Sequence, residues 1–136
     1  MKYWWAVGAA GAVGAVLRYE AGLWAHTWWH SAFPLGTLLI NLSGSLILGW
    51  FTAWGILRPA MPEWLRLGFG TGLIGAYTTF STFSVETLTL LQDGRSGCAA
   101  LYVASSLLGG LLFAWTGFRL GRAGTDGAAK GVTGRR

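Results

Sequence analysis

Long apolar stretches alternate with short polar breaks along the chain. Four apolar segments are each close to the roughly 20 residues that a helix needs to cross a bilayer, and they cover residues 3–25, 35–57, 67–91 and 98–120. The clearest break is at residues 58–63, where two prolines and two charged residues end one helix and begin the next. We therefore predict an all-α integral membrane protein, with four transmembrane helices in one domain over residues 1–121.

The composition agrees with a chain that lies in lipid. Hydrophobic residues make up 53% of the sequence and charged residues only 11%, against about a quarter charged residues in a soluble domain. Glycine is abundant (22 residues), yet the mean hydropathy is +0.48, which excludes disorder for most of the chain. Ridges of small residues in the first and third segments let helix backbones approach closely. We expect these ridges to serve both packing within the chain and a homo-oligomer interface.

The net charge of +5 is concentrated at the C-terminus. Basic residues of this region are Arg119, Arg122, Lys130, Arg135 and Arg136. Residues 122–136 therefore predict a basic, disordered tail, which is either attracted to anionic lipid headgroups or simply solvated. Because no basic surface interleaved with aromatics occurs elsewhere, no nucleic-acid partner is expected. A positive-inside count favours both termini in the cytoplasm.

Aromatic and ionisable residues near the segment ends fit positions at the membrane surface. Trp and Tyr cluster there, as in the aromatic belts of membrane proteins: Tyr3, Trp4, Trp5, Trp24, Trp28, Trp29 and Trp64. His26 and His30 are four residues apart, but a solvated or headgroup-facing position is favoured over a metal site. Arg18, beside Glu20, either reaches the headgroups or has a role that the sequence does not assign.

No enzyme chemistry is indicated. The sequence has no paired carboxylates, no nucleophile beside a base, no phosphate-binding loop and no metal-ligand spacing. Its single cysteine, Cys98, rules out an intrachain disulfide and a cysteine-based metal site. We therefore expect a protein that is not an enzyme.

Polar side chains inside the apolar segments are the candidate functional residues, because in hydrocarbon they must find a partner or line a cavity. Asn41 lies in the second segment, with Ser45 one turn later. Its amide can donate to a ligand, but a hydrogen bond between helices is the commoner use of Asn in membranes and is favoured on position alone. Tyr102 and Ser106 lie one turn apart in the fourth segment, and either face a common path or belong to a packing seam.

The third segment carries the strongest polar signal, the sequence GAYTTFSTFSVE over residues 75–86. Its hydroxyl side chains belong to Thr78, Thr79, Ser81, Thr82 and Ser84. On a continuous helix Phe80 and Phe83 share one face, while Thr78, Thr82 and Glu86 would form a separate polar stripe. A helix this polar must line a wet path or a protein interface rather than face lipid.

The same sequence predicts a broken helix. Gly75 followed by a pair of threonines is expected to interrupt the third helix near its middle and to expose backbone carbonyls. Broken membrane helices commonly place such carbonyls at cation sites.

Three of these motifs together resemble the Fluc (CrcB) family of fluoride channels. GAVGAVLRY at residues 11–19 resembles the first-helix motif of the family, PLGTLLINLSG at residues 34–44 its second-helix motif, and residues 75–86 its third-helix signature. The motifs follow the family's order on the matching segments, and the resemblance extends to about Leu120.

The resemblance implies a fluoride-selective channel that lowers cytoplasmic fluoride by passive efflux. It implies a dual-topology homodimer, with two antiparallel subunits that each cross a prokaryotic cell (inner) membrane several times. It also implies a structural sodium ion at the dimer centre, held by the backbone carbonyls of Gly75 and Thr78. The basic tail departs from the family pattern, because a charge bias disfavours insertion in both orientations.

The resemblance also assigns residues to the fluoride pathway. Asn41 would be the amide donor to fluoride, and Phe80 and Phe83 would be the pore phenylalanines. A polar track would comprise Ser81, Thr82, Ser84, Glu86, Tyr102 and Ser106.

Two other functions compete with a channel. A proton-coupled exporter of the small multidrug type is also a small four-helix protein, but it relies on a membrane-embedded Glu in its first helix, whereas Glu20 lies near the end of this segment beside Arg18. A non-transporting membrane scaffold would explain the glycine ridges, but it would not explain why the third segment is rich in hydroxyl side chains.

Overall fold

The computed structural model describes residues 2–56 and 61–133, with the side chains of residues 2–55 and 61–123. Every element in this part of the chain is helical. The elements are α1 (Trp4–Trp28), α2 (Leu35–Ile56), α3 (Glu63–Leu67), the π-helix η1 (Gly68–Ile74), α4 (Gly75–Tyr77), α5 (Phe80–Gln92) and α6 (Ser96–Thr133). The third predicted segment is thus a series of short elements, and the other three are single helices.

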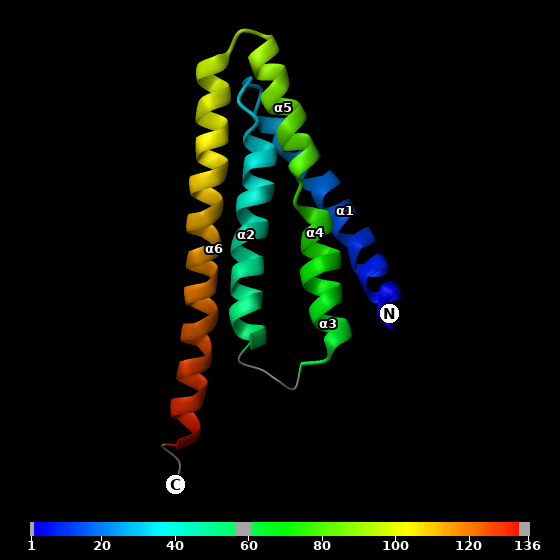
Figure 1. The fold of residues 1–136 in the computed structure, drawn as a ribbon, viewed down its shortest axis with the longest axis vertical. Helices are drawn as coiled ribbons and strands as arrows, with labels where there is room; N and C mark the ends of the chain where they lie inside the picture. The colour runs from blue at the N-terminus through cyan, green and yellow to red at the C-terminus, as the bar shows by residue number, and fades with distance from the viewer. Residues whose placement is uncertain (1, 57–60, 134–136) are drawn as a thin grey trace.

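The elements form four rods that alternate in direction (Figure 1). α1 runs up the bundle, α2 runs down, α3 to α5 lead back up as one interrupted rod, and α6 runs down beside α2. The most extensive contact between elements joins α2 with α6, followed by that of α1 with η1. The four predicted helical segments are confirmed in number and order.

Two helices in the described part of the chain are long and apolar enough to cross a membrane, over Leu35–Gly55 and Ser96–Ala123. α1 has sufficient length but carries Arg18 and Glu20, and the third rod is divided into shorter pieces. Many large apolar side chains are exposed on the single chain, and Leu111 of α6 reaches 72%. This apolar surface fits an all-α membrane protein.

Glycines bring α1 against η1. A Cβ added at Gly14 would collide with the backbone of Leu73, and one at Gly72 would lie 2.7 Å from the carbonyl oxygen of Val7. A side chain at either position would therefore push the two rods apart. These glycines belong to the ridges predicted for internal packing, and that part of the prediction is confirmed.

A second glycine seam joins α2 to α6. A Cβ at Gly49 would collide with the backbone of Ala114, and one at Gly117 would collide with the backbone of Leu46. In the fourth segment, a packing seam was predicted only as the alternative interpretation of Tyr102 and Ser106. In the structure these glycines give α2 and α6 their closest approach.

α6 differs from its prediction at the C-terminal end. The fourth span was expected to end near Leu120 and to continue as a disordered tail over residues 122–136, whereas the helix continues to Thr133. Extending an existing helix adds a hydrogen bond per residue without a new nucleation cost. Residues 134–136 of the predicted tail lie outside the described residues.

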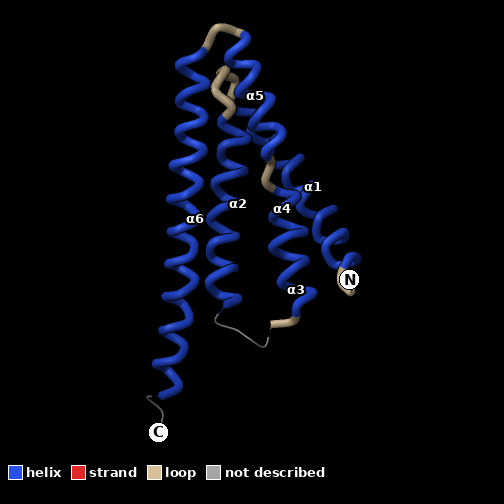
Figure 2. The backbone as a smooth tube through the Cα atoms, in the orientation of Figure 1, coloured by secondary structure: helices blue, strands red, loops and turns tan. Residues whose placement is uncertain are grey.

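The interruption of the third rod lies at Thr78 and Thr79. Figure 2 shows it as a short loop between α4 and α5. Both residues have extended backbone dihedrals, with ψ of 158° and 124°, and helical structure resumes at Phe80. The break was predicted at Gly75 and the threonine pair after it, and Gly75 itself is helical, with φ −62° and ψ −33°. The threonine pair rather than the glycine is therefore the non-helical point.

Candidate functional site

A pair of hydrogen bonds links α2 to the interruption. The Asn41 side-chain amide donates to the backbone oxygen of Thr79 at 2.9 Å, and the Thr79 N–H donates to Asn41 Oδ1 at 2.8 Å. Asn41 thus makes the hydrogen bond between helices that its position favoured. Its amide retains a second N–H, so the implied role as donor to fluoride stays a prediction.

The side chain of Thr79 caps the start of α5. Its hydroxyl oxygen accepts from the Thr82 N–H at 3.2 Å, which satisfies one of the free donors of the first helical turn. The same hydroxyl lies 3.0 Å from the Thr82 hydroxyl and 3.3 Å from the Ser81 hydroxyl. Thr79 is only 8% exposed, whereas Ser81 and Thr82 are exposed, so the cluster extends from the interior to the surface of the chain.

At the interruption, two backbone carbonyl groups lack the N–H donors that they would have in a continuous helix. In a continuous helix the Thr79 N–H would donate to the Gly75 oxygen, and the Thr82 N–H would donate to the Thr78 oxygen. In the structure the first donates to Asn41 and the second to the Thr79 side chain. The carbonyls of Gly75 and Thr78 are therefore available to another electropositive partner.

A cavity of about 350 Å³ lies between α2, the interruption and α6. Its lining includes six of the residues assigned from the sequence: Asn41, Gly75, Thr78, Phe80, Phe83 and Ser106. The Ser106 hydroxyl is buried and has no hydrogen-bond partner among the described residues. An unsatisfied buried hydroxyl costs free energy, and a small polar ligand or water in this cavity would remove that cost.

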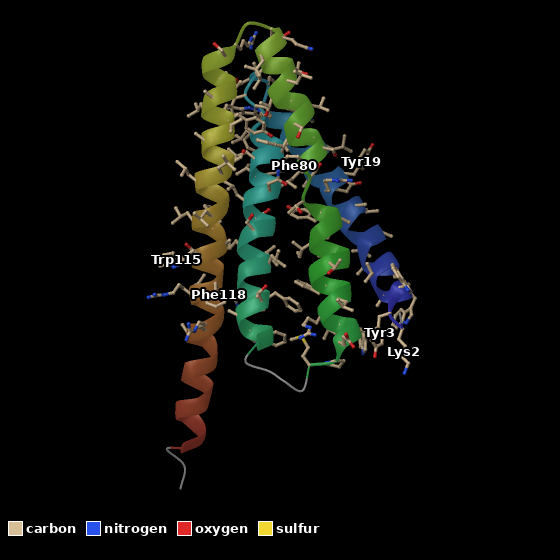
Figure 3. All side chains as sticks on the ribbon, viewed as in Figure 1. Lys2, Tyr3, Tyr19, Phe80, Trp115 and Phe118 are labelled. Carbon is tan, nitrogen blue, oxygen red and sulfur yellow. The ribbon has the colours of Figure 1, made fainter. Side chains whose placement is uncertain are left out.

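The two phenylalanines differ in environment although they are neighbours on α5. Their ring centroids are 5.8 Å apart. Phe83 is half-buried and packs against Tyr102 at 5.1 Å, whereas Phe80 is 80% exposed on the single chain (Figure 3). Phe80 thus connects the cavity to the outer surface of the subunit.

A second polar group lies further along α5. The carboxyl of Glu86 accepts from the Thr37 hydroxyl at 2.8 Å and from the Tyr102 hydroxyl at 2.7 Å. Tyr102 is fully buried and packs edge-on against Phe33. Glu86 also lines a cavity of about 300 Å³ beneath the loop between α1 and α2. Phe83, in contact with Tyr102, lies between this group and the first cavity.

The predicted polar stripe of Thr78, Thr82 and Glu86 is wrong. Thr78 precedes the interruption, so it does not share the helical repeat of α5. Ser84 donates to the backbone oxygen of Phe80 at 2.8 Å, a bond within its own helix, and lines neither cavity. Tyr102 and Ser106 belong to different surroundings, the first beside Glu86 and the second in the cavity of Asn41.

Two buried threonines beside the site were not among the site residues predicted from the sequence. Thr37 and Thr79 are the buried polar residues in the described part of the chain, each 8% exposed. Thr37 precedes Asn41 by one helical turn, so its place on the same face of α2 was a usable signal. Thr79 was noted only as one hydroxyl among several, because sequence does not reveal which residue caps α5.

A metal site formed by ionisable side chains is not seen among the described residues, where no three His, Cys, Asp or Glu side chains gather. His26 is exposed at the rim of the Glu86 cavity, and His30 is exposed outside its lining.

Comparison with known proteins places these motifs in a family. The family description "CrcB-like protein, Camphor Resistance (CrcB)" matches residues 5–118. "Fluoride-specific ion channel FluC 2" of Geobacillus kaustophilus is 52% identical over 83% of this chain and 88% of its own length. "Fluoride-specific ion channel FluC 1" of Bacillus cereus is 50% identical over 85% of this chain and 84% of its own length. The interrupted third rod and its polar cavity thus lie within the matched region, and the chain belongs to the CrcB family.

Proposed function

We propose that the chain is a fluoride-selective ion channel that lowers cytoplasmic fluoride by passive efflux. The observation that carries this proposal is the cavity at the interruption. Its lining combines the rings of Phe80 and Phe83 with the buried Ser106 hydroxyl, which has no hydrogen-bond partner in the described part of the chain. The two relatives that are 52% and 50% identical to this chain support the proposal, since both are called fluoride-specific ion channels.

The chemistry of the cavity suits a small, strongly hydrated anion. Fluoride leaves water only where dense hydrogen-bond donors replace its hydration shell. The Ser106 hydroxyl and the second amide N–H of Asn41 are such donors, and neither fixes the anion to a full positive charge. The edge of an aromatic ring is the positive end of its quadrupole, so the edges of Phe80 and Phe83 complete a favourable environment.

The carbonyls of Gly75 and Thr78 fit a structural sodium ion. Their regular helical donors are engaged by Asn41 and by the Thr79 side chain, and hard cations bind oxygen ligands. Bound sodium would supply a fixed positive charge close to the fluoride path, which lowers the cost of holding an anion there. Replacing sodium by N-methylglucamine on both sides of a liposome membrane should then abolish fluoride release, and unchanged release would exclude this role.

The functional unit that we infer is a dual-topology, antiparallel homodimer crossing the prokaryotic inner membrane several times. A single subunit leaves Phe80 80% exposed beside the cavity, so the wall of the pathway is incomplete without a neighbour. A second copy would cover this face and bring two interruptions together. Chemical crosslinking in the membrane, with cysteine labelling from each side, tests the dimer and its orientation separately.

The two competing functions find less support in the site. For a proton-coupled exporter, Glu20 is exposed on the surface of α1 and outside both central cavities. For a scaffold, a buried hydroxyl that lacks a hydrogen-bond partner among the residues the structure describes would lower stability without serving a function.

The cellular claim is tested in a bacterium that lacks its own fluoride export. Expression of the chain should restore growth in millimolar fluoride, and the Phe80→Ile variant at equal membrane abundance should fail to do so. Growth that the chain does not restore, or that both proteins restore equally, would contradict the proposal.

A further inference from the structure

The third rod contacts α2 on both sides of the Thr78 carbonyl group along the chain. After this carbonyl, the Thr79 N–H donates to Asn41 Oδ1 at 2.8 Å. Before it, the Tyr77 hydroxyl lies 3.0 Å from Ser43 Oγ. The channel and cation site proposed above account for the first contact, but not for the second.

Tyr77 is the donor in the second contact. The Ser43 hydroxyl donates its only hydrogen to the Ile40 carbonyl oxygen of its own helix at 3.0 Å, so its oxygen accepts from Tyr77. Both side chains are half-buried, and a hydroxyl group at membrane depth needs such a partner. The hydrogen bond therefore fixes the end of α4 against α2.

Tyr77 lies between the two carbonyl groups that fit a cation. α4 covers only Gly75–Tyr77, and Thr78 follows it directly. The Gly75 oxygen comes two residues before Tyr77, and the Thr78 oxygen one residue after it. A rotation of this short helix would therefore displace both oxygens.

The direction of the Thr78 oxygen is set from the other side. In a trans peptide the C=O and N–H groups point in opposite directions, and the bond between Thr78 and Thr79 is trans. Because the Thr79 N–H points at Asn41 Oδ1, the Thr78 oxygen points away from that atom. Asn41 thus sets the direction of this oxygen, while Tyr77 and Ser43 set the position of the helix end that carries it.

Gly44 of α2 makes this close arrangement possible. A Cβ added there would collide with the Thr78 side chain and would lie 3.4 Å from the Tyr77 ring. The backbone of α2 therefore lies directly against both residues. The bond to Ser43 holds Tyr77 in this contact.

The Tyr77–Ser43 pair lies outside the cavity of Asn41 and Phe80. Both residues line instead a separate cavity of about 230 Å³, together with residues of α1 and α6. Removing either hydroxyl therefore changes no group that faces the proposed fluoride path.

We propose that Tyr77, through its hydrogen bond to Ser43, positions the carbonyl groups of Gly75 and Thr78 for a cation, an inference that rests on the sodium site of the proposed function. Tyr77 is a positioning residue, because its hydroxyl acts through Ser43 and not on the ion. Without that hydroxyl, α4 is held by a side-chain hydrogen bond to α2 on one side of Thr78 only. Ligand groups that are less firmly positioned bind more weakly, so the affinity for sodium falls.

The test compares sodium binding by the purified full chain and its variants in detergent. The midpoint of thermal unfolding is measured as sodium chloride replaces N-methylglucamine chloride at constant ionic strength. A ligand that binds only the folded protein raises the midpoint once its concentration exceeds its Kd, so each titration gives an apparent Kd for sodium. Tyr77→Phe and Ser43→Ala should each raise this Kd about fivefold, the effect of one hydrogen bond on an equilibrium constant.

Two further variants separate positioning from general stability. Tyr3→Phe makes the same chemical change at the start of α1, away from the interruption beside Phe80 (Figure 3), and should leave the Kd unchanged. Ser43→Thr keeps the acceptor oxygen and should retain the wild-type Kd. A merely structural role of Tyr77 would lower the midpoint in the absence of sodium and leave the Kd as it is.

The possible results distinguish this proposal from the sodium site itself. An unchanged Kd in Tyr77→Phe, or an equal rise in Tyr3→Phe, would overturn the positioning role while the sodium site stands. A wild type whose midpoint does not respond to sodium would overturn both. The double variant of Tyr77→Phe with Ser43→Ala should raise the Kd no further than either change alone, and additive increases would show that the two residues act independently.

Discussion

Asn41 of α2 and Thr79 of the interrupted third rod exchange two hydrogen bonds, of 2.9 Å and 2.8 Å. This pair satisfies both backbone polar groups of Thr79 at a point where helical bonding stops. An unsatisfied backbone group inside hydrocarbon costs several kcal/mol. The irregular backbone of the third rod is therefore stable only because a side chain from another helix replaces its missing partners.

Asn41→Asp should weaken this junction. A carboxylate still accepts from the Thr79 N–H, but it has no donor for the Thr79 oxygen and places two acceptors close together. We expect a loss of about 1–3 kcal/mol in the free energy of unfolding, seen as earlier thermal unfolding in detergent, together with loss of fluoride release from liposomes.

The matched control is Thr52→Val on the same helix. The Thr52 hydroxyl is exposed and bonds only to the Leu48 carbonyl of its own helix, so unfolding should change by less than about 0.5 kcal/mol. Equal behaviour of Asn41→Asp and the control would contradict the role of the junction.

The helical segments could be predicted from the sequence, but the details of the junction could not. Apolar length and proline breaks sufficed for α1, α2 and the start of α6, because these features act locally. The position of the interruption depends on the long-range pairing of Asn41 with Thr79, 38 residues away. Without that contact, Gly75 was the more obvious helix-breaking residue, and the stripe from Thr78 to Glu86 followed from a continuous helix that does not exist.

Phe80 and Phe83 should respond differently to replacement by isoleucine. Phe80 is largely exposed, so Phe80→Ile should leave thermal unfolding of the subunit nearly unchanged while it lowers fluoride release at least about tenfold, which corresponds to about 1.4 kcal/mol. Phe83→Ile should lower both, because the Phe83 ring packs against Tyr102 at 5.1 Å. Unchanged fluoride release in Phe80→Ile would contradict a role of this ring in the fluoride pathway.

Gly14 and Gly8 of α1 offer a matched pair for the helix seam. A Cβ at Gly14 meets the Leu73 backbone, whereas a Cβ at Gly8 has nothing within 4 Å. Gly14→Ala should therefore destabilise the fold by about 1–3 kcal/mol through overpacking, while Gly8→Ala should be neutral or stabilising by up to about 1 kcal/mol through helix propensity. Thermal unfolding of both variants decides the matter, and equal midpoints would show that the α1–η1 contact is looser than described.

Glu86 and Tyr102 should be energetically coupled. The Tyr102 hydroxyl donates to the Glu86 carboxyl at 2.7 Å inside the protein, so Tyr102→Phe leaves that carboxyl oxygen without its donor. We expect a coupling free energy between about 0.5 and 3 kcal/mol from a double-mutant cycle with Glu86→Gln, measured by unfolding. Thr89→Val is the control partner for Glu86→Gln, because the Thr89 hydroxyl is exposed and bonds to Val85. Additive effects in the Tyr102 cycle would indicate that this hydrogen bond contributes little.

Fluoride release from liposomes is the decisive experiment for conduction of fluoride through the cavity beside Phe80 and Ser106. Liposomes with the purified chain would be loaded with fluoride or chloride, and external ion concentrations followed with selective electrodes after a valinomycin-mediated potassium efflux is started. We expect rapid fluoride release, no chloride release above protein-free liposomes, and loss of the fluoride signal in Phe80→Ile. Absence of fluoride release, or equal release of chloride, from protein shown to be folded and monodisperse would contradict it.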